Sequence, residues 1–154
     1  MSQVLILGSL LTLLSLSEQT DCLCDSATWL RQPRLYLNTE ELLAPTCYGF
    51  SLVVSPTDTV VSETILASGS WQPQLVHLVS QLVSAGDIVV NLGAHVGLEA
   101  LLMGQIVRNS PTKKGHIYAF EPYSASYRLL VKNVFINGLE DVISCYRLAV
   151  GSNT

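Results

Sequence analysis

The second half of the chain alternates between helix-like and strand-like segments, and this alternation limits the possible folds more than any other feature. From Leu75 to Val83 apolar residues repeat at helical spacing, and Ile88 to Asn91 then has the pattern of a buried strand. The pattern continues with a helix over 98–107, a strand over 117–120, a helix over 124–136 and a third strand over 142–150. Strands and helices in this order predict an α/β fold with a parallel sheet, in which ligands bind beyond the carboxyl ends of the strands.

The sequence divides into three parts. Residues 1–17 have the pattern of a signal peptide, and residues 18–73 are a proline-punctuated lead that predicts short strands and turns. Residues 74–154 form the alternating α/β segment. Because the chain stops at Thr154, just past the third strand, we expect a partial domain whose sheet is truncated after that strand.

An apolar run from Val4 to Leu16 precedes the polar residues Ser17 and Glu18. A membrane-spanning helix needs ~20 residues, so this run fits a signal-peptide core better than a span. No Lys or Arg precedes it, which leaves a short uncleaved anchor or a buried helix as alternatives. We therefore expect the secretory pathway or the extracellular space, with membrane anchoring through this segment as the alternative.

Cysteine usage agrees with an oxidising compartment. The chain has four cysteines, and a bridge from Cys22 or Cys24 to Cys47 is the expected pairing. Cys145 lies in an apolar strand-like run, where a free thiol is expected. The Cys-Leu-Cys pair lacks a nearby His and paired CxxC spacing, so no metal site is expected.

Composition excludes two classes of protein. With 49% hydrophobic and 13% charged residues, the chain is not a disordered polar segment. A net charge of −4 with only eight Lys and Arg offers no clustered basic surface, so no nucleic-acid partner is expected.

Two glycines mark a candidate ligand site between the first strand and the following helix. Gly93 lies in the tight turn, where a side chain would obstruct a ligand, and Gly97 permits close packing of the helix start against the strand. The amides at that helix N-terminus suit a carboxylate or phosphate. The alternative is that these glycines serve the turn alone.

An acidic residue follows the neighbouring strand at the same edge of the sheet. The Glu121 carboxylate is placed to accept hydrogen bonds from both hydroxyls of a ribose. Its alternative role is to place negative charge at the N-terminus of the helix that begins at Ser124. The chain has neither a GxGxxG turn nor a GxxxxGK[ST] loop, so the pattern favours a nucleoside ligand without phosphate.

The stretches 86–97 and 117–123 resemble the first and second motifs of the FkbM methyltransferase family. The resemblance extends from about Asp58 to Ser152, and its further matches are Gly69–Gln72, Leu129, Asn133, Asn137–Leu139 and Ala149–Gly151. It implies a Rossmann-like class I methyltransferase fold that binds S-adenosylmethionine. In that arrangement Gly93 and Gly97 lie under the methionine portion and Glu121 holds the ribose.

The cofactor-binding residues that follow from this resemblance are Asn91, Gly93, Ala94, His95, Gly97 and Glu121. Asn91 stands where the family usually has Asp, which removes a charge that would favour the ligand's ammonium group. Gln72 likewise stands where an acid is common. His95 has a packing role as its alternative, and no catalytic base is nominated.

The function that the resemblance implies is methyl transfer to oxygen, with a hydroxyl of a small molecule or glycan as acceptor. One alternative is a non-catalytic, secreted Rossmann-like binding domain. Another is an incomplete product that never folds stably, because half a sheet would leave the strand from Ile88 unpaired on one side.

Overall fold

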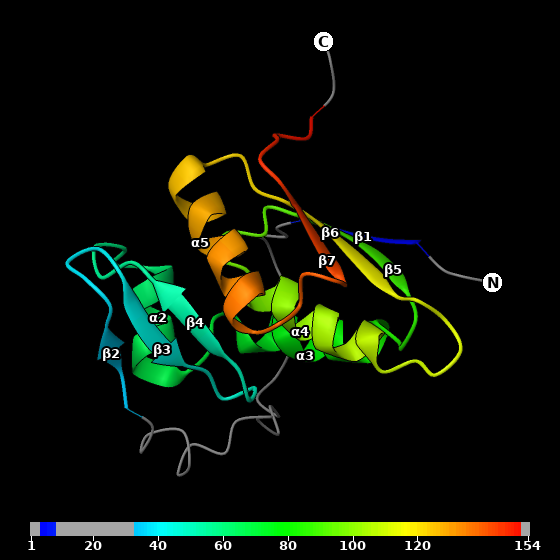
Figure 1. Ribbon diagram of the computed structural model, residues 1–154, viewed down its shortest axis with the longest axis horizontal. Coiled ribbons are helices and arrows are strands. Elements are labelled where there is room, and N and C mark those ends of the chain that lie inside the picture. The colour runs from blue at the N-terminus through cyan, green and yellow to red at the C-terminus, as the bar shows by residue number, and fades with distance from the viewer. Residues whose placement is uncertain (1–3, 9–32, 152–154) are drawn as a thin grey trace. The chain divides into compact units, whose positions relative to one another are not determined.

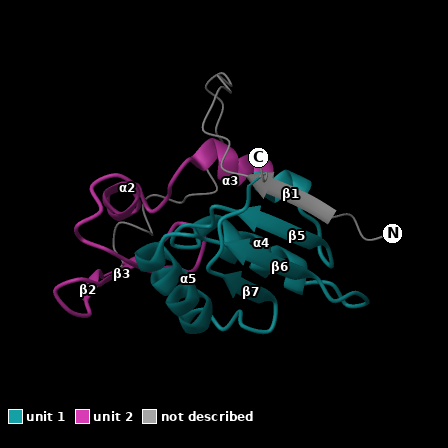
Figure 2. Ribbon diagram, turned by 90° about the horizontal axis from the view of Figure 1, so that it is seen from above, with its two compact units in different colours: residues 1–14, 79–154 teal, residues 15–78 magenta. Residues whose placement is uncertain are grey.

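The computed structural model describes residues 4–8 and 33–151, and the chain divides into two compact units (Figures 1 and 2). One unit contains residues 1–14 and 79–154, and the other contains residues 15–78. The first holds the predicted α/β segment, and we call it the α/β unit. The second, which we call the antiparallel unit, lies within the predicted lead and the start of the following helix.

The α/β unit is built on a four-stranded parallel sheet in the order β1-β5-β6-β7. Its strands are β1 (Val4–Gly8), β5 (Ile88–Leu92), β6 (His116–Phe120) and β7 (Ile143–Tyr146). The parallel sheet confirms the predicted fold class. The expectation that one side of the Ile88 strand is unpaired is wrong, because β1 pairs with β5 along its whole length. Since β1 belongs to the segment predicted as a signal peptide, cleavage there would remove this strand.

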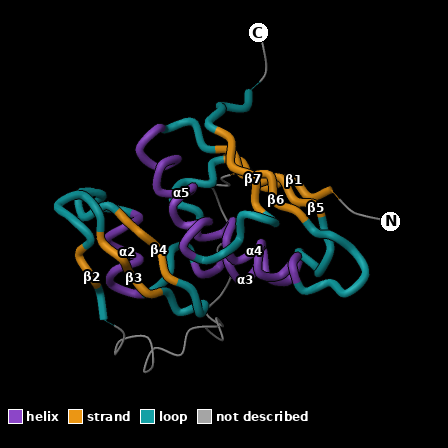
Figure 3. The backbone as a smooth tube through the Cα atoms, in the orientation of Figure 1, coloured by secondary structure: helices purple, strands orange, loops and turns teal. Residues whose placement is uncertain are grey.

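Helices α4 (Leu98–Arg108) and α5 (Ser124–Ile136) lie on one side of this sheet (Figure 3). Burial alternates along the strands, as it must when one face is covered. Val89 and Ala119 are buried, whereas Val90 and Tyr118, on the opposite face, are partly exposed. The ends of the strands are therefore held against the starts of α4 and α5, which is where the candidate site lies.

The third strand is shorter than the sequence indicates. β7 ends at Tyr146, and residues 147–150 are exposed and outside the sheet. The α5 helix, in contrast, has the predicted bounds. It ends where Gly138 adopts a left-handed conformation with φ of 60° and donates its N–H to the Phe135 carbonyl oxygen.

The described part of the antiparallel unit contains a three-stranded sheet in the order β2-β3-β4. Its elements are β2 (Leu35–Tyr36), β3 (Leu42–Pro45), β4 (Ser51–Val54) and α2 (Val61–Ser68); α3 (Pro73–Leu82) begins here and continues into the α/β unit. The strands agree with the predicted lead, but α2 does not. Its helical conformation ends at Gly69, whose φ of 74° no branched side chain would favour.

Asp58, which the resemblance singled out, holds the first turn of α2. Its Oδ1 atom accepts hydrogen bonds from the amides of Val60 and Val61, and Oδ2 accepts them from the amide and hydroxyl of Ser62. Burial alone would raise the pKa of Asp58, but these hydrogen bonds outweigh burial and lower it below the ordinary value of 3.8. Asp58 therefore has a structural role in this unit.

Asp58→Ala is expected to destabilise the antiparallel unit by about 1–2 kcal/mol at pH 7, because the first turn of α2 loses its hydrogen-bond acceptor. Since the folded-state pKa is lowered, this contribution is present above pH 3.8 and disappears as the pH falls through the folded pKa. Urea unfolding at pH 7 and pH 3 measures both effects. Asp58→Asn, which keeps Oδ1, should lose less; equal stability of all three proteins would contradict the role.

Cys47 of the antiparallel unit is in a disulfide, and its partner is not among the described residues. Cys145 in β7 is a free thiol, as expected, although only half-buried, and burial raises its pKa to about 11. Within residues 4–8 and 33–151, no helix has the length and apolar character needed to cross a bilayer.

Candidate functional site

The turn between β5 and α4 is left-handed at three positions. Gly93 has φ of 77°, His95 of 51° and Gly97 of 100°. For the two glycines this conformation has no steric cost, whereas for His95 it is strained. Strain of this kind persists only where surrounding contacts hold it, and it gathers at ligand sites.

The first three amides of this turn are bound by the neighbouring strand. The N–H groups of Gly93 and Ala94 both donate to the Phe120 carbonyl oxygen, at 2.9 and 3.0 Å, and the His95 N–H donates to the Glu121 carboxylate. The amides of Gly93, Ala94 and His95 are therefore not free to bind an anion, and the expectation for the amides at the N-terminus of α4 stays a prediction. The turn is instead fixed to the end of β6.

Glu121 connects the two strand-to-helix turns. Its Oε2 atom accepts from the His95 amide at 2.8 Å, and Oε1 accepts from the Tyr123 amide at 2.9 Å. Its own amide donates to the carbonyl oxygen of Tyr146 in β7. The side chain is buried, with 5% exposure. Because a carboxylate oxygen can accept two hydrogen bonds, each oxygen retains a lone pair for a ligand hydroxyl.

Helix α5 packs directly against the turn. A Cβ atom at Gly97 would lie 2.7 Å from Leu130 Cδ1, so the glycine permits the close approach of α5. The sequence indicated instead that the close approach would be that of the strand. The fully buried Asn133 side chain donates from Nδ2 to the Val96 carbonyl oxygen at 2.8 Å. Asn133, a position of the FkbM resemblance, thus anchors the turn to α5.

Two buried nitrogen atoms in this region have no hydrogen-bond partner within the described part of the chain. They are Nδ2 of Asn91, a residue with 6% exposure, and Nδ1 of His95. Leaving a buried polar group unpaired costs about 1–3 kcal/mol, so native proteins rarely do so without a reason. Both atoms belong to residues of the predicted cofactor site.

The structure adds Glu99, which the sequence interpretation did not nominate. It lies in the first turn of α4, is half-buried, and forms a hydrogen bond to its own backbone N–H. Burial raises the pKa of its carboxyl group. The signal in the sequence was a single acidic residue in a helix that is otherwise apolar over its first turns.

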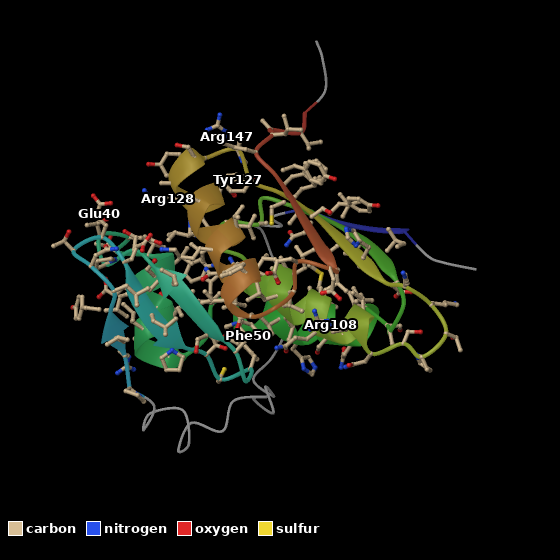
Figure 4. The ribbon with its side chains drawn as sticks, viewed as in Figure 1. Glu40, Phe50, Arg108, Tyr127, Arg128 and Arg147 are labelled. Atoms are coloured by element: carbon tan, nitrogen blue, oxygen red, sulfur yellow. The ribbon has the colours of Figure 1, made fainter. Side chains whose placement is uncertain are left out.

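Other polar residues lie apart from this edge. His116 is at the amino end of β6, where its Nε2 bonds to Ser144 Oγ at 2.9 Å, in agreement with a structural role. Arg108, at the carboxyl end of α4 and labelled in Figure 4, donates to Asp141 and to the Gly138 carbonyl oxygen. Among the described residues, no group of three or more metal-ligand side chains is assembled.

Solved structures of TYW2 and Trm5 share this architecture. TYW2 from Pyrococcus horikoshii, in complex with MeSAdo, matches 75% of this chain with a TM-score of 0.55 and 17% identity. TYW2 from M. jannaschii, in complex with AdoMet, matches 75% with a TM-score of 0.54 and 18% identity. The α/β unit has the Rossmann-like fold of these proteins. Trm5 from Methanocaldococcus jannaschii, in complex with adenosine, matches 71% with a TM-score of 0.51 and 22% identity.

The matched part is only a portion of each of these proteins. It covers 38% and 46% of the two TYW2 chains and 30% of the Trm5 chain. At such identities the likeness concerns the fold. No protein-family model matches the sequence, and no curated protein matches it, so the resemblance to the FkbM family depends on the motifs alone.

Proposed function

We propose that this chain is the cofactor-binding part of an S-adenosylmethionine-dependent methyltransferase. The observation that carries the proposal is the Glu121 carboxylate, which is buried at the carboxyl edge of the sheet and connects the two turns. Ligands of open parallel sheets bind at this edge. The complexes of the fold neighbours with AdoMet, MeSAdo and adenosine support a nucleoside ligand here.

The residues present fit this cofactor. The remaining lone pairs of Glu121 are suited to the two ribose hydroxyls, and the unpaired Asn91 Nδ2 and His95 Nδ1 lie in the residues proposed to contact the ligand. When bound, S-adenosylmethionine would supply a methyl group on a sulfonium. The protein would orient it and exclude water from the reacting atoms, which accounts for much of the acceleration of a displacement reaction.

The acceptor proposal comes from the FkbM resemblance. We propose transfer to oxygen, on a hydroxyl of a small molecule or glycan. The net charge of −4 supports an acceptor other than a polyphosphate chain. Fold neighbours include Trm5 solved with tRNALeu, and transfer to tRNA is the outcome that would overturn this acceptor class.

For localisation we propose the secretory pathway or the extracellular space, with a membrane anchor at the N-terminal segment as the alternative. The disulfide of Cys47 supports an oxidising compartment. Expression in a secreting cell tests whether the protein is released. The mass of the released protein then shows whether the N-terminal segment has been cleaved. Retention in the cytosol with reduced cysteines would overturn the proposal.

Calorimetric titration of the purified chain tests the cofactor proposal. We expect S-adenosylmethionine and S-adenosylhomocysteine to bind, and ATP and NAD to bind at least 10-fold more weakly, because the turn has no pyrophosphate-binding glycine pattern. Equal binding of all four ligands, or no binding of the first two, would overturn it. A chain that binds the cofactor but transfers no methyl group to hydroxyl acceptors would match the non-catalytic alternative.

A further inference from the structure

One face of the parallel sheet in the α/β unit is not covered by α4 or α5. A Cβ atom at Gly104 of α4 would lie 2.7 Å from Ile143 Cδ1, so α4 covers the face that holds Ile143 and its partner Ile117. Helix α5 lies on the same side of the sheet (Figure 1). Because side chains alternate between the two faces of a strand, the other set of residues points to the opposite side. We call this side the open face; its described residues on β6 and β7 are His116, Tyr118, Phe120, Ser144 and Tyr146.

Four aromatic rings form a continuous row on the open face. The ring centroids of Tyr118 lie 4.8 Å from those of His116 and 6.3 Å from those of Tyr146. Tyr146 in turn stacks on Phe120 with a centroid distance of 5.0 Å, and the two tyrosines are 36% and 37% exposed. The residues that β5, β6 and β7 place on this face include no Asp, Glu, Lys or Arg. Because parallel sheets are normally covered on both faces, a neutral aromatic face of this kind is expected to bind an apolar surface.

The connections between the strands of this sheet are expected to lie on the other face. The sheet order β1-β5-β6-β7 is also the chain order, so the three connections all move in the same direction across the sheet. Crossovers between parallel strands are right-handed in almost all proteins, and right-handed crossovers that move in one direction lie on one face. That face is the one that α4 and α5 cover. A partner for the open face is therefore expected to come from outside these connections.

The outer side of α5 carries exposed apolar side chains. Val131, Phe135 and Ile136 are 41%, 69% and 43% exposed. Val131 and Phe135 are four residues apart and so lie on one side of the helix, and Ile136 follows Phe135. We call these three residues the α5 stripe. The inner side of the helix, with Leu130 and Asn133, packs against the turn before α4, so the α5 stripe faces away from the sheet.

We propose that the α5 stripe of one copy of this chain packs on the open face of a second copy. The two surfaces lie on opposite sides of the α/β unit, and a helix packed on a sheet is the layer arrangement of α/β folds. The described part of the open face is uncharged and the α5 stripe is apolar, so the contact buries no charge at its centre. Because one copy cannot bring its own two surfaces together, each copy binds two neighbours in a head-to-tail arrangement.

The size of the contact determines how strong this association is. Helix α5 has 13 residues and is ~20 Å long, and the five-residue strand β6 is ~16 Å long, so the helix spans the open face. A helix about 10 Å wide covers roughly 160 Å² of a flat face over that length. Even with surface relief this area is well below the ~800 Å² per partner of a stable complex. We therefore expect weak association, with a dissociation constant of roughly 10–500 µM.

Sedimentation velocity of the full chain at concentrations of roughly 5–500 µM tests the proposal. We expect the wild type to change from monomer to larger species as its concentration rises. Added salt should strengthen the association, because every copy carries the same net charge of −4. Phe135→Lys and Tyr118→Lys should each weaken it by roughly 10-fold or more, because a charge is then buried in the contact. Tyr36→Lys, at a position in the antiparallel unit with 71% exposure, is the control and should associate as the wild type does.

An equal mixture of the two variants tests the head-to-tail arrangement. Phe135→Lys keeps its open face and Tyr118→Lys keeps its α5 stripe, so the mixture should form one-to-one pairs although neither variant associates alone. Val131→Lys and Tyr146→Lys are a second pair of variants, used if either of the first two has a lowered thermal midpoint. A wild type that is monomeric at every concentration would overturn the proposal. Undiminished association of Phe135→Lys would also overturn it, because the open face would then bind a different surface, and so would a mixture that stays monomeric.

Discussion

Glu121→Ala is expected to lose cofactor binding by roughly 100-fold or more and to destabilise the α/β unit by about 2–4 kcal/mol. The affinity loss follows from removal of two charge-assisted hydrogen bonds to the ribose. The stability loss follows because the amides of His95 and Tyr123 lose their acceptor, which separates the two turns. Calorimetry with S-adenosylmethionine and urea unfolding measure the two effects.

Two further variants separate binding from stability in this experiment. Glu121→Gln keeps one acceptor oxygen and the side-chain volume. Its loss of unfolding free energy should therefore be about half of that in Glu121→Ala, so that the protein remains folded for the binding measurement. Glu140→Ala removes the same charge from an exposed position and should change neither quantity. Full cofactor affinity in a folded Glu121→Gln or Glu121→Ala protein would remove Glu121 from the site.

Gly97→Ala is expected to destabilise the α/β unit by about 2–5 kcal/mol. Alanine at φ of 100° is strained, at about 1–2 kcal/mol, and its Cβ would lie 2.7 Å from Leu130 Cδ1. Leu130 is fully buried, so any shift of its side chain disturbs the surrounding core, and overpacking of a core costs a further 1–3 kcal/mol or so. A domain at the lower end of the ordinary range, at roughly 5 kcal/mol, would be close to unfolding.

Gly138→Ala is the matched control for backbone strain. Gly138 also has positive φ, at 60°, but a Cβ there would meet no atom within 4 Å, so only the strain of about 1–2 kcal/mol is expected. Adding Leu130→Ala to Gly97→Ala relieves the clash, so the double variant should be more stable than the sum of the single effects predicts. Equal losses for Gly97→Ala and Gly138→Ala, measured by thermal unfolding, would show that close packing contributes nothing.

Regular elements of the α/β unit were predictable because their signals are local. The helical repeat from Ser124 to Ile136 and its Asn-Gly ending define α5 within one segment. The α2 helix was missed because its short apolar pattern lies among prolines, although Asp58 ahead of it was a capping signal. The pairing of β1 with β5 was not predictable, since an apolar N-terminal run has the same composition as a signal peptide or a strand.

The sequence by itself determined that a parallel α/β sheet forms and that a glycine turn and an acidic residue follow adjacent strands. Only the tertiary structure decided how these residues are used. It brought Leu130 against Gly97, directed Glu121 to the amides of two turns, and left Asn91 Nδ2 and His95 Nδ1 without hydrogen-bond partners in the described chain. Contacts between residues distant along the chain leave no periodic signal, because they depend on how the elements pack.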